Sequence, residues 1–173
     1  MSARGRSYRY VGPVELKTAV RPGGGGCRIS SAAGFDGWIA ERSAPELAEP
    51  FTFVVGTDGV LRLAPRRSEH VACAGGDMVL SAGEISFMRE ADRWAVCEVS
   101  NQSTGYCPDV TSWSAVARAL DNVELGRHSA FTHEVVFRRC PDCQEHNIVR
   151  EDDFVCVFCG SDLPAAWNVD PTA

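Results

Sequence analysis

The sequence predicts an α+β fold, an antiparallel β-rich domain with one main helix and a small hairpin at its C-terminal end. Three observations predict it. Residues 51–137 are dominated by segments with the two-residue alternation of strands, only residues 112–121 in that range have strong helical spacing, and the tail carries two Cys-x-x-Cys pairs. The expected organisation is an α+β domain over 1–136, with an irregular part at 1–50 and a β-rich core at 51–136, and then a ribbon over 137–165.

Composition supports a globular protein. The chain of 173 residues is 45% hydrophobic and 23% charged, which is enough apolar material for a packed core. The net charge of −6 excludes a general electrostatic affinity for nucleic acid or for anionic membranes. No run approaches the roughly 18 apolar residues of a membrane span, and the first ten residues have no apolar signal region. We therefore expect a cytoplasmic protein.

The N-terminal part is predicted to be irregular. Residues 8–20 mix aromatic and β-branched residues and suggest a strand or an extended entry. The glycines at 23–26 then form a break. A short helix is predicted within residues 29–41 after a serine cap, although Gly34 and Gly37 weaken it.

From residue 51 the pattern becomes that of strands. Residues 51–55 and 60–63 flank Asp58-Gly59 and predict a hairpin with a short turn. The remaining expected elements are strands at 83–88, 94–99 and 131–137 and the main helix at 112–121, in which Trp113, Val116 or Ala117, and Leu120 fall on one face.

The tail carries the most specific motif. Cys140 and Cys143 form one Cys-x-x-Cys pair, Cys156 and Cys159 form the second, and twelve residues separate the pairs. In a reducing compartment, two such pairs indicate a metal before they indicate disulfides. Two facing knuckles supply four thiolates at tetrahedral corners, as zinc requires. The sequence therefore predicts one structural Zn²⁺, whose closed four-thiolate shell leaves no position open for catalysis.

Details of the ribbon are also predicted. Residues 147–150 and 154–158 alternate as a hairpin around a turn at 151–153, and Gly160 suits a left-handed backbone. His146 is expected to be exposed and not to be a ligand. The pattern of zinc deaminases does not fit, because His133 and Glu134 are adjacent and the second cysteine pair would have no role.

The charge of the ribbon argues against nucleic acid. Residues 137–163 contain three arginines and six acids, so the module would repel phosphate. Protein contact, or stapling of the domain, is favoured.

Two segments suggest a second site. The first runs from His70 to Asp77 through the paired glycines Gly75 and Gly76, and the second is the hydrogen-bonding run 100–108. Both are expected at strand ends, where sites are commonly built.

These segments carry a resemblance over about residues 60–110. A His precedes Ala-Gly-Gly, Ala82-Gly83-Glu84 begins a strand, and Ser103-x-Gly-Tyr106-x-Pro follows. The pattern resembles the central domain of plant IQ-motif calmodulin-binding proteins and related bacterial proteins. Here the first motif is one residue shorter, the His before the Tyr is absent, and calmodulin binding does not carry over because there is no IQ helix. The resemblance implies a shared fold and a pocket near His70 and Tyr106.

Three interpretations of these residues remain open. In the first, His70, Glu84, Ser103 and Tyr106, with the paired glycines, bind a small polar ligand or a protein. In the second, the arrangement is similar to ADP-ribosyltransferase-like folds, and His70, Glu84 and Tyr106 act on a nucleotide-like substrate from one concave pocket. In the third, His70 bonds a neighbouring carbonyl and Tyr106 packs beneath the hairpin.

The leading hypothesis is a zinc-stapled binding or interaction protein. Its partner is expected to be a protein or a small polar ligand, without general nucleic-acid or membrane binding. Cys73, Cys97 and Cys107 are expected to be small buried hydrophobes, with Cys107 the one to test for reactivity, and Cys27 is expected to be exposed.

Overall fold

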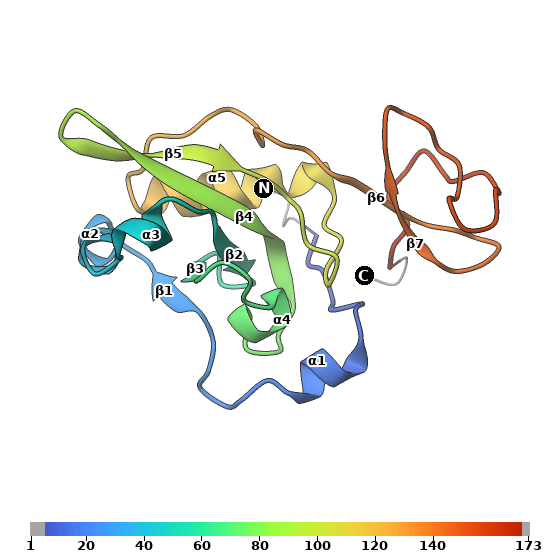
Figure 1. The fold of residues 1–173 in the computed structure, drawn as a ribbon, viewed down its shortest axis with the longest axis horizontal. Helices are drawn as coiled ribbons and strands as arrows, with labels where there is room; N and C mark the ends of the chain where they lie inside the picture. Colours follow the sequence, from blue (N-terminus) through green and yellow to red (C-terminus); the bar gives the residue numbers. More distant parts are fainter. Residues whose placement is uncertain (1–5, 171–173) are drawn as a thin grey trace.

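Five strands form an antiparallel sheet in the order β1-β3-β2-β4-β5, and the computed structural model describes them within residues 6–170 (Figure 1). The strands are β1 (Cys27–Ile29), β2 (Phe51–Gly56), β3 (Leu61–Ala64), β4 (Val79–Glu90) and β5 (Arg93–Val99). The helices are α1 (Val14–Thr18), α2 (Ala32–Ala40), α3 (Ala44–Leu47), α4 (His70–Cys73) and α5 (Trp113–Asn122), with one 3-10 turn, η1 (Val110–Ser112), before α5. A second, two-stranded sheet of β6 (Val136–Arg139) and β7 (His146–Val149) lies beyond one end of the first. The α+β prediction is confirmed.

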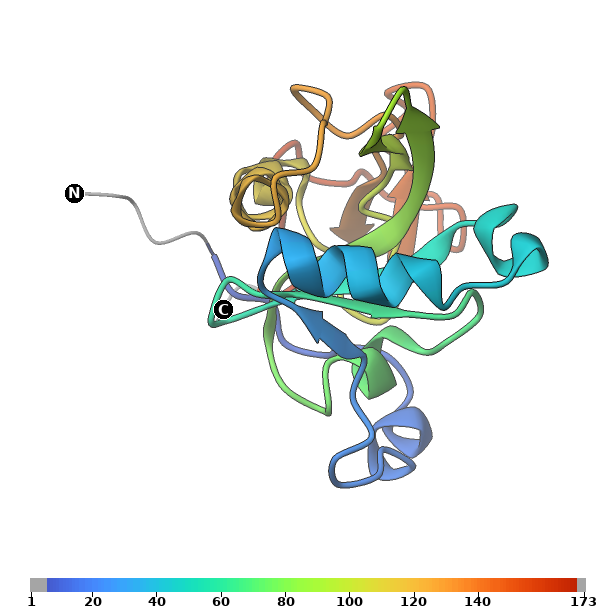
Figure 2. The same cartoon turned by 90° about the vertical axis from the view of Figure 1, so that its left-hand side faces the viewer.

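Both faces of the sheet are covered, as Figure 2 shows, with α2 and α5 on one face and α4 on the other. The central strand β2 is therefore buried along its whole length. Its alternate residues serve different cores: Phe53 and Val55 pack in the cluster with α2 and α5, and Val54 packs in the cluster with α4.

The predicted hairpins are confirmed. Asp58 Oδ1 accepts a hydrogen bond of 3.0 Å from the Val60 amide, and Gly59 takes φ +79°, so the Asp-Gly pair turns the chain between β2 and β3. β4 and β5 include the predicted strands 83–88 and 94–99 and extend them.

Both predicted helices form. Ser31 caps α2 by accepting a 3.0 Å hydrogen bond from the Gly34 amide. Helical spacing then places Phe35, Trp38 and Ile39 in the core, and α5 likewise buries its residues Val116, Ala119 and Leu120. The longest helix of the described part of the chain, α5, has 10 residues, and no described helix could cross a bilayer.

Two expected strands differ in extent from the prediction, which for residues 8–20 also allowed an extended entry in place of a strand. In residues 8–20 only Tyr8 pairs, with Val79, and α1 follows because Pro13 supplies an extended residue before a run of helix formers. The strand expected at 131–137 begins only at Val136, because the chain before it runs beside the end of β5.

This preceding segment lines the outer edge of β5. The Val96 amide donates to the Gly126 carbonyl at 2.8 Å, and the Thr132 amide donates to the Val99 carbonyl at 2.9 Å. A bulge lies between these two bonds, where the pairing of β4 with β5 shifts between Ser86 and Phe87.

Candidate metal centre

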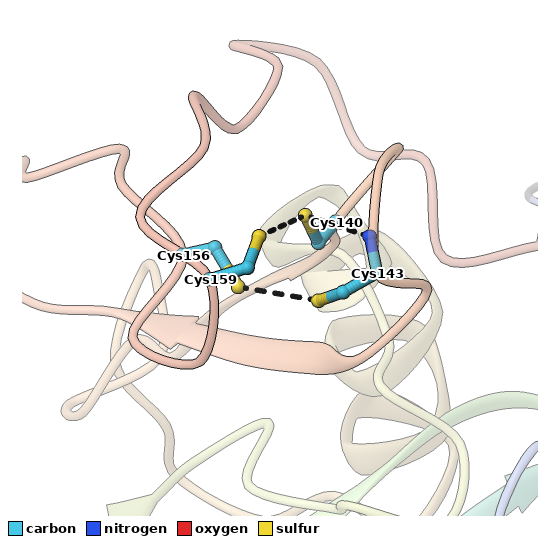
Figure 3. A group of neighbouring side chains, drawn as sticks. All are labelled: Cys140, Cys143, Cys156 and Cys159. Carbon is cyan, nitrogen blue, oxygen red and sulfur yellow. Dashed lines mark hydrogen bonds between the residues drawn. The ribbon is translucent and has the colours of Figure 1, made fainter.

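The four predicted ligands meet in the C-terminal hairpin. Their Sγ atoms all lie within 4.8 Å of one another, with Cys140 and Cys159 3.5 Å apart and Cys143 and Cys156 3.6 Å apart (Figure 3). Four sulfurs about 2.3 Å from one zinc ion stand about 3.8 Å from each other, whereas a disulfide bond measures about 2.05 Å. The spacing therefore fits a four-thiolate metal site of zinc's geometry, and all four thiols are free of disulfides.

Two matching knuckles, residues 140–145 and 156–161, build this cluster. In the first knuckle, the Cys140 carbonyl accepts a hydrogen bond of 3.0 Å from the Gln144 amide, and the Cys140 amide donates one of 2.9 Å to the Glu145 carbonyl. In the second knuckle, the Cys156 carbonyl accepts a hydrogen bond of 2.9 Å from the Gly160 amide, and the Cys156 amide donates one of 2.8 Å to the Ser161 carbonyl. The fifth residue has a left-handed backbone, with φ +69° at Gln144 and +80° at Gly160. Each knuckle thus turns both of its thiols to one side.

The pairing within the ribbon differs from the prediction. The hairpin is formed by β6 and β7, which flank the first knuckle, and not by 147–150 with 154–158. The latter segment has only one bridge, between Val155 and Asp162. Short knuckle bonds hold its backbone instead, and its alternation of exposed and buried residues ends at Val157, because Phe158 and Cys159 are also exposed. His146 begins β7 and is partly buried, so its predicted exposure is wrong.

Hydrogen bonds favour thiolate at Cys156. Although desolvation raises its pKa, the Asn147 amide, 3.4 Å from Sγ, and the backbone amides of Phe158 and Cys159 lower that pKa to about 6. Asn147 also accepts a 2.9 Å bond from the Val157 amide through its Oδ1. Its role was not predicted, because an asparagine in a strand has no distinctive spacing.

The chain after the ribbon returns to the main domain. Arg138, from β6, donates to the carbonyls of Pro164 and Ala165 at 3.0 and 2.7 Å. Trp167 then donates from Nε1 to the Cys107 carbonyl at 2.7 Å. The hairpin that carries the four cysteines is consequently fastened to the loop that follows β5.

The residues of the second predicted site make packing contacts. His70 Nε2 is bonded to the Gly83 carbonyl at 2.8 Å, and the Tyr106 hydroxyl donates to the Asp77 carbonyl at 2.7 Å. Ser103 is buried and its hydroxyl accepts from the Tyr106 amide at 3.3 Å. Of these bonds, the third interpretation predicted the one between His70 and a neighbouring carbonyl.

The other predicted residues lie apart from that pair. Gly75 and Gly76 form the left-handed turn after α4, with φ +66° and +86°. Glu84 is exposed and lines a surface hollow in which neither His70 nor Tyr106 takes part. The structure thus does not bring His70, Glu84 and Tyr106 into one described pocket.

Two of the remaining cysteines are buried as expected. Desolvation raises the pKa of Cys73 and of Cys107 to about 12, so neither thiol is a nucleophile at neutral pH. Cys27 is exposed, as predicted. Cys97 is exposed, contrary to prediction, because it has no partner in the register of β4 with β5 and occupies the bulge.

Acidification is expected to destabilise the protein through His70. Burial lowers its pKa, outweighing the bond to Gly83 and the nearby Glu84 and Glu69, which favour the charged form. Since the unfolded state has a pKa of about 6.5, it binds the proton first, and stability falls as the pH drops below that value. A His70→Gln variant, whose side-chain amide can donate the same hydrogen bond, should lose less stability than the wild type when the pH falls. Melting temperatures at about pH 7.5 and pH 5.5, with excess zinc, test this, and equal decreases would contradict it.

The comparisons with known proteins give no family for this chain. No protein-family model, no curated protein and no solved structure matches it. The resemblance of residues 60–110 to IQ-motif proteins thus gains no support from them.

Proposed function

We propose that this protein is a protein-binding module in which a structural zinc ion shapes the contact surface. The observation that carries the proposal is the exposure of Val157 and Phe158, whose side chains are 76% and 63% accessible. They lie between the predicted ligands Cys156 and Cys159, within the second knuckle. With Val155, which is 38% accessible, they form a surface that we term the knuckle tip.

The knuckle tip has the character of a binding surface. Single exposed apolar residues are common on protein surfaces, whereas neighbouring exposed apolar residues often mark an interaction site. The knuckle tip has three such residues close together in the chain. The metal would hold this loop from both sides, so little conformational entropy would be lost on binding. A large aromatic side chain presented in this way is typical of interface hot spots.

The chemistry of the cluster supports binding in preference to catalysis. Four thiolates complete the tetrahedral shell of zinc and leave no coordination position for a substrate. The excess of six acids over three arginines in residues 137–163 opposes nucleic acid as the partner. A four-thiolate site and four further free cysteines suit a reducing compartment, so the proposal includes a cytoplasmic location.

Polar replacement of the knuckle tip tests the proposal. Val157→Ser with Phe158→Ser should leave the zinc content unchanged, because neither side chain is a ligand. The partner is first identified by cross-linking to the wild-type protein and then purified. The double variant should bind this partner about tenfold more weakly or worse, which corresponds to a loss of about 1.4 kcal/mol of binding free energy.

The matched control is Met88→Ser, which removes an apolar side chain that is 40% accessible on the β4–β5 hairpin. Partner affinity that is unchanged in the double variant, or reduced equally by Met88→Ser, would overturn the proposal.

A further inference from the structure

The four sulfurs of the candidate metal centre make two contacts between the knuckles. The Sγ atoms of Cys140 and Cys159 are 3.5 Å apart, and those of Cys143 and Cys156 are 3.6 Å apart (Figure 3). Each contact joins one cysteine of the first knuckle to one cysteine of the second. A disulfide bond in either pair would therefore connect the two knuckles to each other.

Each contact also joins residues of different exposure. Cys159 is exposed, whereas its partner Cys140 is buried. Cys143 is half-buried, whereas its partner Cys156 is buried. A dissolved oxidant can thus reach one residue of each pair, and the second sulfur is held close to the first. An accessible cysteine beside a second, resolving cysteine is the arrangement found at redox-sensitive sites.

The protonation state of the cluster favours oxidation there. A zinc ion bound by the four cysteines would keep them as thiolates, because a coordinating thiol loses its proton. The thiolate is the form that attacks an oxidant. Cys27 and Cys97 are also exposed, but they do not belong to the cluster of potential ligands. The cluster is therefore the place where oxidation should begin.

We infer that the two pairs are oxidation sites, at which a peroxide forms the disulfides Cys140–Cys159 and Cys143–Cys156 and so causes loss of the zinc ion. In the first step, the Cys159 thiolate attacks one oxygen of hydrogen peroxide. The O–O bond breaks, which leaves a sulfenic acid on Cys159 and releases hydroxide. In the second step, the Cys140 thiolate attacks the Cys159 sulfur, the S–O bond breaks and a second hydroxide leaves. Protons from the solvent convert both hydroxides to water.

The second pair reacts in the same way and consumes a second peroxide. Cys143 is the residue that the oxidant reaches, and Cys156 resolves its sulfenic acid. Because an S–S bond measures about 2.05 Å, the sulfurs of each pair must approach by roughly 1.5 Å. Oxidation leaves no thiolate to hold the ion, and a thiol reductant restores all four ligands by disulfide exchange.

Oxidation would also act on the knuckle tip. Two of its three residues, Val157 and Phe158, lie between Cys156 and Cys159. One ion would fix both of these cysteines in the reduced protein, whereas each is joined to a different cysteine in the oxidised protein. We therefore expect oxidation to weaken partner binding. This consequence rests on the function proposed above, whereas disulfide formation and zinc release do not.

Zinc release and disulfide mapping test the inference without a partner. Hydrogen peroxide is added to the zinc-loaded full-length protein, and a zinc-responsive dye measures the released metal. One zinc ion per chain should be released as the two disulfides form, and dithiothreitol should restore zinc binding.

Mass spectrometry of proteolytic peptides identifies the pairing. Trypsin cuts after Arg139 and after Arg150, so only disulfides between the knuckles join peptide 140–150 to peptide 151–173. Further cuts before Asp142, by an aspartate-specific protease, and after Phe158, by chymotrypsin, separate all four cysteines. The disulfides Cys140–Cys159 and Cys143–Cys156 are the expected result.

The matched control is the variant Cys27→Ser with Cys97→Ser, which removes the two exposed thiols outside the cluster. It should release zinc and form the same disulfides as the wild type. The inference is overturned if Cys27 and Cys97 are oxidised while zinc stays bound, if the disulfides form within a knuckle, or if zinc leaves without a disulfide.

The Val157→Ser, Phe158→Ser variant separates this inference from the proposed function. It retains all four cysteines, so it should release zinc and form the same disulfides as the wild type even though it no longer binds the partner. A double variant that resists oxidation would overturn the inference, whereas a double variant that still binds the partner would overturn only the proposed function.

Discussion

Removal of zinc is expected to unfold residues 136–163 and to leave the five-stranded sheet folded. The hydrophobic cluster of the ribbon is small, and its buried members are two of the ligands, Cys140 and Cys156, together with Val149 and Leu163. Apolar burial on this scale cannot offset the ordering of so many residues. A structural zinc ion held by the four thiols would supply much of the folding free energy, on the order of 10 kcal/mol.

Amide NMR spectra before and after chelation measure this directly. Signals of β6, β7 and both knuckles should lose their dispersion, while those of β2 and β4 keep it. Metal analysis should return one zinc per chain, and Cys140→Ser should reproduce the chelated spectrum. Cys97→Ser is the control, because that exposed thiol lies outside the cluster. A protein purified without metal whose ribbon signals stay dispersed would contradict the expectation.

Gly83→Ala is expected to have the largest effect of any single methyl group added to the main domain. A Cβ at this position would overlap the carbonyl oxygen of Ser100, and both the carbonyl carbon of Ser100 and the Cα of Asn101 lie close behind it. Because these are backbone atoms, no rotamer change can relieve the overlap, and the end of β5 must move. Destabilisation of about 3–5 kcal/mol, or failure to fold, should follow.

The control for this substitution is Gly37→Ala in α2. A Cβ there meets no atom within 4 Å, and alanine is favoured over glycine within a helix by up to about 1 kcal/mol. The two substitutions are expected to change the free energy of unfolding in opposite directions. Urea unfolding should therefore show a large loss of stability for Gly83→Ala and no loss for Gly37→Ala. A Gly83→Ala protein as stable as the wild type would show that β4 and β5 are not packed as described.

Local patterns account for what the sequence could predict. The β2–β3 turn depends on Asp58 and Gly59, which are adjacent, and α2 depends on a serine cap three residues from its partner. The metal cluster needed only two Cys-x-x-Cys pairs, since each pair forms its own knuckle. In all three cases the residues that determine the structure are close together in the chain.

Features that depend on distant residues were missed or misplaced. Asn101 bonds Val135, and Trp167 bonds the Cys107 carbonyl, across separations that no periodicity reveals. The exposure of Cys97 follows from a shift in register between two strands. The knuckle tip resembled strand alternation at Val155 and Val157, because the buried Cys156 lies between these two exposed residues.

The segment that lines the outer edge of β5 has a consequence for solubility. Exposed sheet edges recruit strands from other molecules, which is a route to amyloid-like assembly. Here the Val96 amide and the Val99 carbonyl are already engaged by the chain itself, and the bulge at Cys97 breaks the regular row of donors and acceptors. At the opposite border of the sheet stands β1, with only three residues. Neither border offers a foreign strand a long template, and fibril growth by sheet extension is disfavoured at both.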